Sequence, residues 1–414
     1  MIASVGVLQL VGVAALAACA VLSVAVAWWP TSSTVGSARI HPAIAVGIAA
    51  VAVRLAFLLL SDGDQYDIFY AFRGVGEHVR QGGDAFDPGY VGRQNYAPVM
   101  VWWWAFVSWA IPGDQTHVYS AILRLPYLLA DAAIAPLLLV VVGGGRGVRA
   151  GWLYALSPIA IAVSTLHGQD DACVALLLLL AVIVIPRRWL LAAVFVGVAA
   201  AVKPWALFFV PALLAGLPLR AWWRFVAVSA APMALAFAGY ALIHPAHIVD
   251  GISRMVRYSA PVEGLGTGQL AIGHSQGVVS VLNIVAGVCV IAAAVLSRRR
   301  GDRPADAVAL GMVLLLALSP TTADQYLMWP IPFLLYAGRT RLCVLLSLAL
   351  VPATAYLDLW VNQHVYDVLL RLPLGIASVA LLLTAAHLLA GRDVALPAWR
   401  RRLRSPQQQP AISA

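Results

Sequence analysis

The chain has 414 residues, of which 62% are hydrophobic and only 11% are charged. A water-soluble domain of this size cannot present such a composition to solvent, so a soluble enzyme is excluded. The formal charge of +9 would suggest nucleic acid as the partner of a soluble protein. In a membrane protein the cations first report orientation, and we expect no nucleic-acid partner.

Apolar segments follow one another along the chain and predict an all-α polytopic membrane protein. A span needs about 20 apolar residues, or fewer inside a bundle, which gives about thirteen transmembrane helices. The segments are 3–28, 43–60, 120–142, 151–166, 170–186, 189–203, 204–219, 222–243, 274–296, 306–320, 325–337, 341–358 and 367–391. Because no polar stretch between them could form its own core, we expect a single integral membrane domain over 1–414.

Arginine-rich loops set the expected orientation, since such loops stay on the cytosolic side. The cations assigned to the cytosol include Arg146, Arg149, Arg187, Arg188, Arg220, Arg224, Arg298, Arg299, Arg300, Arg303, Arg339, Arg341 and the Arg400 to Arg404 tail. Most acids then fall in loops on the outer face, and the N-terminus is expected outside.

Two interfacial helices are predicted in the first outer loop, 61–119. The first helix runs from about Asp67 to Gln81 and is amphipathic. Its apolar face consists of Ile68, Phe72, Val75 and Val79. The second covers the tryptophan-rich stretch 98–112, because indole rings prefer the membrane interface.

The first polar cluster on the outer face contains Asp62, Asp64 and Asp67. An acid at a helix N-terminus is often only a cap, and that reading stays open for Asp62 and Asp64. Asp67 begins the amphipathic helix near the bilayer surface, where a general base must lie to deprotonate a hydroxyl beside a lipid.

A second cluster is the motif HGQDD, which includes His167, Gln169 and Asp171. It forms a very short turn between two apolar segments, so its side chains stay close to the bilayer. Gly168 allows the turn to be tight. A plain polar turn would be an alternative explanation.

The third cluster is KPWALFFVP, in which Lys203 and Pro204 break an apolar hairpin. Lys203 is the only lysine of the chain. A lysine at this depth is costly unless it faces an anion, and we expect a lipid-linked phosphate. Snorkelling to the interface is the structural alternative.

The remaining polar residues are less specific. Gln325 and Tyr326 lie in a short outer turn that leads to Trp329, which we expect to be an interface anchor. Arg93 precedes the tryptophan-rich helix and faces either headgroups or a bound phosphate. Arg124 and Asp131 share one helical face and predict an intramembrane ion pair.

In this order the motifs resemble the GT-C superfamily of membrane glycosyltransferases. They are most similar to bacterial polyprenol-phosphate-mannose-dependent mannosyltransferases of the phosphatidylinositol mannoside type and to the catalytic subunit of GPI mannosyltransferase I. The resemblance rests on the Asp67 helix ending at Gly82, Tyr96 with Pro98, RLPYLLAD, HGQDD, KPWALFFVP and QYLMW. It defines a GT-C-like catalytic module at 43–220 and a variable helical module at 221–414.

The resemblance implies an inverting transfer of a sugar, most specifically mannose, from a polyprenyl-phosphate donor to a lipid or glycan acceptor. Asp67 would be the catalytic base, with Asp64 as the alternative. The residues that would bind donor or acceptor are His167, Gln169, Asp171, Lys203, Arg93, Gln325 and Tyr326. The site would face outward from a bacterial cell membrane. Neither a cofactor nor a metal is expected, since the motifs include no nucleotide-binding turn and the cysteines have no metal-ligand spacing.

Three alternatives remain at this stage. A secondary transporter or lipid-linked sugar flippase could also use a broken hairpin with a buried cation. A non-catalytic membrane scaffold would leave the polar clusters without a role. Within the enzyme class, the sugar could be arabinose or glucose.

Overall fold

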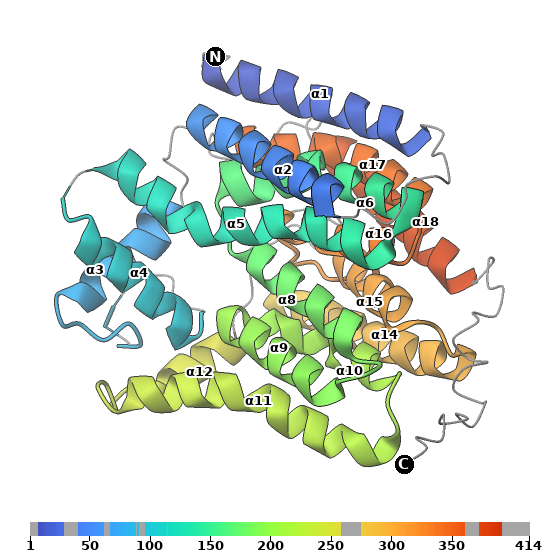
Figure 1. The fold of residues 1–414 in the computed structure, drawn as a ribbon. Coiled ribbons are helices and arrows are strands. Elements are labelled where there is room, and N and C mark those ends of the chain that lie inside the picture. The colour runs from blue at the N-terminus through green and yellow to red at the C-terminus, as the bar shows by residue number, and fades with distance from the viewer. Residues whose placement is uncertain are drawn as a thin grey trace, which may run out of the picture.

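The computed structural model describes residues 7–28, 40–61, 67–87, 89–90, 96–113, 115–257, 275–360 and 372–390. Over these residues the chain is helical, with no strand (Figure 1). Within the described residues, every apolar segment predicted from the sequence contains helical structure, because in an apolar environment a helix satisfies its backbone hydrogen bonds internally.

Five helices of the described chain are long and apolar enough to cross a membrane. They are α2 (Ile40–Leu60), α5 (Thr116–Val142), α11 (Leu219–Ala241), α14 (Gln276–Arg300) and α18 (Leu372–Ala390). A sixth candidate combines α6 (Gly144–Ala155) with Pro158–His167, and the two parts are bent by 43°. Length and composition therefore support five or six spans, fewer than the roughly thirteen predicted from apolar segments.

Most of the other apolar helices are shorter, except α1 (Val7–Trp28) and α17 (Thr340–Trp360), which have 22 and 21 residues. The shorter helices are α7 (Pro158–Ile161), α8 (Asp171–Val184), α9 (Trp189–Val202), α10 (Val210–Leu214), α15 (Pro304–Leu318) and α16 (Pro330–Tyr336). Three irregular turns join them: the π-helix η2 (Ala162–His167) and the 3-10 helices η3 (Pro204–Phe209) and η4 (Asp324–Met328). Proline begins η3, α7 and α16, so each break falls where a backbone donor is missing.

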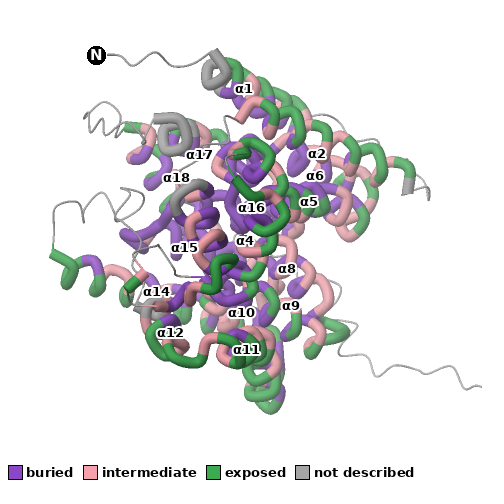
Figure 2. Tube along the Cα trace, turned by 90° about the vertical axis from the view of Figure 1, so that its left-hand side faces the viewer, coloured by how far each residue is buried: buried purple, intermediate pink, exposed green. Residues whose placement is uncertain are grey.

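Large apolar side chains remain exposed along the outer faces of the long helices, while the inner faces are buried (Figure 2). On α14 the exposed residues include Val281, Ile284, Val288 and Ile291. A soluble monomer rarely exposes such a continuous apolar surface, whereas lipid tails solvate it well. The fold is therefore that of a membrane protein.

Arginines predicted to share the cytosolic side meet at one end of the helices. Arg298 Nη1 donates to the carbonyl of Leu217 at 2.7 Å. Arg303 and Arg339 both contact the Asp306 carboxylate, at 2.9 and 3.3 Å. Three separate loops are thus joined at the end where the arginine pattern places them together.

The described part of the segment between α2 and α5 forms a small packed unit at one side of the bundle (Figure 1). It contains the π-helix η1 (Asp67–Arg73), α3 (Gly74–Arg80) and α4 (Pro98–Ala110). The predicted apolar face is buried in full: Ile68, Phe72, Val75 and Val79. Trp104 of α4 stacks on Phe72 with ring centroids 4.5 Å apart, so this indole lies in the protein core and not at the membrane interface.

Asp84 and Ala85 of this segment form hydrogen bonds with α11, in the second half of the chain. Tyr240 of α11 donates its hydroxyl hydrogen to Asp84 Oδ1 at 2.9 Å and accepts from the backbone N–H of Ala85 at 2.9 Å. The amphipathic helix α12 (Ile248–Arg257) follows, and at Gly251 its backbone lies against the ring of Phe86.

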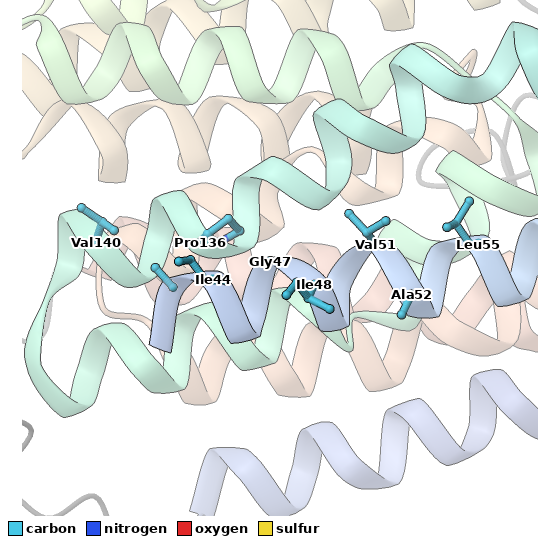
Figure 3. A pocket seen from close by; sticks show the side chains of 9 residues that line it. Ile44, Gly47, Ile48, Val51, Ala52, Leu55, Pro136 and Val140 are labelled. Carbon is cyan, nitrogen blue, oxygen red and sulfur yellow. The ribbon is translucent and has the colours of Figure 1, made fainter. Parts of the chain in front are cut away.

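A groove of about 740 Å³ runs between α2 and α5 (Figure 3). Its lining is apolar throughout: Ala43, Ile44, Gly47, Ile48, Val51, Ala52, Leu55, Pro136 and Val140. None of these residues belongs to the polar clusters, and both helices are membrane-span candidates. The groove is part of the lipid-facing surface.

We expect Gly76→Ala to lower the free energy of unfolding by about 1–3 kcal/mol, as overpacking does. A Cβ at Gly76 in α3 would lie 2.5 Å from the carbonyl oxygen of Trp104 and 2.6 Å from Ser108 Oγ. Gly239→Ala is the control, because a Cβ there meets no atom within 4 Å. Thermal unfolding in detergent compares the two, and an unchanged midpoint for Gly76→Ala would contradict the close packing of α3 on α4.

Candidate active site

The carboxylate of Asp67 is oriented by two side chains from a distant turn. Asp67 is the first residue of η1. Gln169 Nε2 donates to Asp67 Oδ2 at 2.8 Å, and His167 Nε2 lies 3.7 Å from the same oxygen. The Asp67 side chain is still 29% exposed. An acid that is both oriented and accessible is suited to proton transfer.

The turn after η2 requires glycine for two reasons. Gly168 has a φ of +75°, in the left-handed region. A Cβ there would also lie 2.6 Å from Arg124 Nε and from Ile68 Cδ1. The backbone N–H groups of Gly168 and Gln169 both donate to the carbonyl of Val163, at 3.0 and 3.1 Å. The predicted tight turn is confirmed in this geometry.

Lys203 is buried between two carboxylates. It follows α9 in an extended conformation and is 3% exposed. Its Nζ lies 2.7 Å from Asp171 Oδ2 and 3.3 Å from Asp170 Oδ1, and both acids are fully buried. Such charges are tolerated in an apolar interior only as a pair or cluster. A lipid phosphate, the partner expected from the sequence, would have to share the ammonium group with these carboxylates.

Aromatic side chains enclose this ion cluster. The Nζ of Lys203 lies 5.5 Å from the ring centroid of Tyr96 and 5.1 Å from that of Tyr326, within cation–π range. The indole N–H of Trp329 donates to Asp171 Oδ1 at 2.7 Å. The interpretation of Trp329 as an interface anchor is therefore wrong: it is 2% exposed and satisfies a buried acid.

Gln169 connects the ion cluster to Asp67. Its Nε2 donates to Asp67, and its Oε1 accepts from the hydroxyl of Tyr96 at 3.3 Å. The ring of Tyr96 in turn faces Lys203. One buried amide thus bridges the accessible acid and the buried charges.

The cluster of described charges is acidic. Three carboxylates accompany the single ammonium group of Lys203: those of Asp170 and Asp171 contact it, and that of Asp67 is linked to it through Gln169 and Tyr96. One oxygen of Asp170, Oδ2, has no hydrogen-bond partner within the described chain.

The structure brings most of the predicted site residues together. The residues in direct or ring contact are Asp67, His167, Gln169, Asp171, Lys203 and Tyr326. Gln325 is the neighbour of Tyr326 in η4 and is 8% exposed. Asp64 and Arg93 lie outside the described residues.

The predicted ion pair between Arg124 and Asp131 is wrong. Asp131 pairs with Arg54, whose Nε lies 2.6 Å from Asp131 Oδ2, and both side chains are fully buried. Sequence reasoning missed Arg54, although an arginine inside an apolar span carries the same signal as Lys203. Arg124 instead donates to the carbonyl of Thr165 at 2.6 Å and to Ser61 Oγ at 2.7 Å.

Two comparisons with known proteins bear on the function. The sequence model of glycosyltransferase family 87 matches residues 94–320, more than half of the chain. The matched segment includes the His167 turn and Lys203, begins after Asp67 and ends before Gln325. No curated protein matches the chain.

Among the described residues, no group of three His, Cys, Asp or Glu side chains could hold a metal ion.

We expect Lys203→Met to lower the free energy of unfolding by about 3–5 kcal/mol, because it leaves two buried carboxylates without their cation. Adding Asp170→Asn and Asp171→Asn should recover part of this loss. Thermal unfolding in detergent measures each variant, with Arg146→Met as a control that removes an exposed cation.

A Lys203→Met protein with wild-type stability and weakened donor binding would contradict this expectation. It would assign Lys203 to direct contact with the donor phosphate.

Proposed function

Because the chain belongs to glycosyltransferase family 87, we propose that it is an inverting enzyme that uses a polyprenyl-phosphate-linked sugar. The sugar is most specifically mannose, and the acceptor is a hydroxyl of a membrane lipid or a lipid-linked glycan. The donor class and the sugar rest on the sequence motifs quoted above. Asp67 is the proposed base.

The observation that supports this role is the contrast among the three acids of the cluster. Asp67 is partly exposed and oriented by Gln169, whereas Asp170 and Asp171 are buried against Lys203. A general base must reach the acceptor hydroxyl within hydrogen-bond distance. Of the three acids, only Asp67 has a side chain that an acceptor can approach.

In the proposed reaction, the acceptor oxygen attacks the anomeric carbon on the side opposite to the phosphate. Asp67 takes the proton of the acceptor hydroxyl as the new glycosidic bond forms. The bond between the anomeric carbon and the phosphate oxygen breaks, and polyprenyl phosphate leaves with the electron pair. Because this phosphate is a good leaving group, the protein mainly has to supply alignment and charge stabilisation.

The other site residues take supporting roles. His167 and Gln169 hold the Asp67 carboxylate in one orientation. We propose that Asp171, Gln325 and Tyr326 lie on the donor side of the site. The ammonium group of Lys203, which Asp170 and Asp171 neutralise, would lie near the donor phosphate. We propose Arg93 as a ligand of the donor phosphate, and Asp64 as the alternative base.

We further propose that the shorter apolar helices also lie in the membrane, completing roughly thirteen passes. The arginine-rich ends would then face the cytosol, and the Asp67 cluster would face the outside of a bacterial cell membrane. Family membership does not favour a transporter or flippase.

We expect Asp67→Asn to reduce sugar transfer by roughly 10²–10⁴-fold, because an amide cannot accept the acceptor proton. The assay supplies membranes with radiolabelled polyprenyl-phosphomannose and follows label in the acceptor fraction. Asp87→Asn makes the same isosteric change in the same loop, where the acid only accepts from the backbone of Gly89, and should leave transfer unchanged.

Unchanged transfer in Asp67→Asn would exclude Asp67 as the base, and loss in Asp64→Asn alone would move the role to Asp64. Polyprenyl-phosphoglucose and polyprenyl-phosphoarabinose, tested in parallel, identify the sugar. If none of the three donors is used, the proposed donor class fails.

A further inference from the structure

We propose that Asp131 and Arg124 are positioning residues, which hold η2 from the side of α5 and thereby aim His167 and Gln169 at Asp67. The inference rests on the proposed function of Asp67. It assigns a role to two charges that sequence reasoning had paired with each other.

Asp131 is hydrogen-bonded to η2 through Ser164. The hydroxyl of Ser164 donates to Asp131 Oδ2 at 2.7 Å. The same carboxylate is fixed by Arg54 Nε at 2.6 Å and by the hydroxyl of Tyr154 at 2.6 Å. All four side chains are fully buried. Asp131 is therefore a rigid anchor that joins α2, α5 and α6 to η2.

Arg124 is hydrogen-bonded to the next residue of η2, Thr165. It lies two turns before Asp131 on the same face of α5, since seven residues make about two helical turns. Its Nη1 donates to the carbonyl of Thr165 at 2.6 Å. Its Nε also lies beside Gly168, close enough to exclude any side chain there. The two charged residues of α5 thus hold Ser164 and Thr165, immediately before the turn.

An anchored π-helix explains how the turn can be precise. In η2 the backbone bonds span five or six residues, as in Gly168 and Gln169 donating to Val163. Such π turns are rare and are frequent at functional sites. Their looser backbone needs outside support, which Asp131 and Arg124 provide. A site group must be held within about 0.5 Å of its productive position, so loosening η2 should weaken the orientation of Asp67.

The test uses Ser164→Ala, because replacing Asp131 would leave Arg54 unpaired and could unfold the protein. We expect transfer from polyprenyl-phosphomannose to fall roughly 10- to 100-fold in kcat, with a thermal midpoint close to wild type. Ser378→Ala is the matched control: it removes a buried hydroxyl that bonds within α18, far along the chain from the turn.

A double-mutant cycle separates positioning from general stability. If Ser164 acts through the orientation of Gln169, its effect on kcat should largely disappear in a Gln169→Ala background. Fully additive effects of Ser164→Ala and Gln169→Ala would overturn the proposal.

Hydrogen exchange gives a readout that does not depend on the reaction. In Ser164→Ala, the amides of 162–171 should exchange faster while those of α5 and α6 stay unchanged. Unchanged exchange over 162–171 would overturn the proposal. Because this measurement needs no substrate, it decides on the positioning role even if the wild type transfers no mannose and the proposed function fails.

Discussion

Charges buried in an apolar bundle must find partners, and this constraint fixes how the helices of the site meet. Lys203 joins the end of α9 to the start of α8 through Asp170 and Asp171. Arg54 joins α2 to α5 through Asp131. An unpaired charge at either place would cost several kcal/mol. The His167 turn lies between these two ion clusters, so its position follows from theirs.

The sequence predicted local features well, because they depend on neighbouring residues. The helical segments, the apolar face with Ile68 and Phe72, and the tight turn at Gly168 all follow from periodicity or from backbone preference. The partners of buried charges could not be predicted in the same way. Spacing made Arg124 and Asp131 look like a pair, yet α2 supplies the partner of Asp131. Such choices depend on which helices pack together, which no local pattern contains.

The site also shows why residue type alone does not assign a role. The motif HGQDD places two acids side by side, and both are buried against a lysine. The acid that remains accessible comes from another part of the chain and is held by the amide of Gln169. Environments that separate similar carboxylates are a common way to divide acid and base roles. Burial and pairing, rather than the number of acids, therefore single out Asp67.

The bond between Trp329 and Asp171 spans 158 residues, and that between Tyr240 and Asp84 spans 156. A chain made from its N-terminus therefore exposes the acidic turn long before the residues that complete it exist. Asp171 has no indole donor until α15 and the following residues up to Trp329 have been made. The site therefore cannot be completed before Trp329 has been made, and shorter chains that already contain HGQDD and Lys203 still lack this contact.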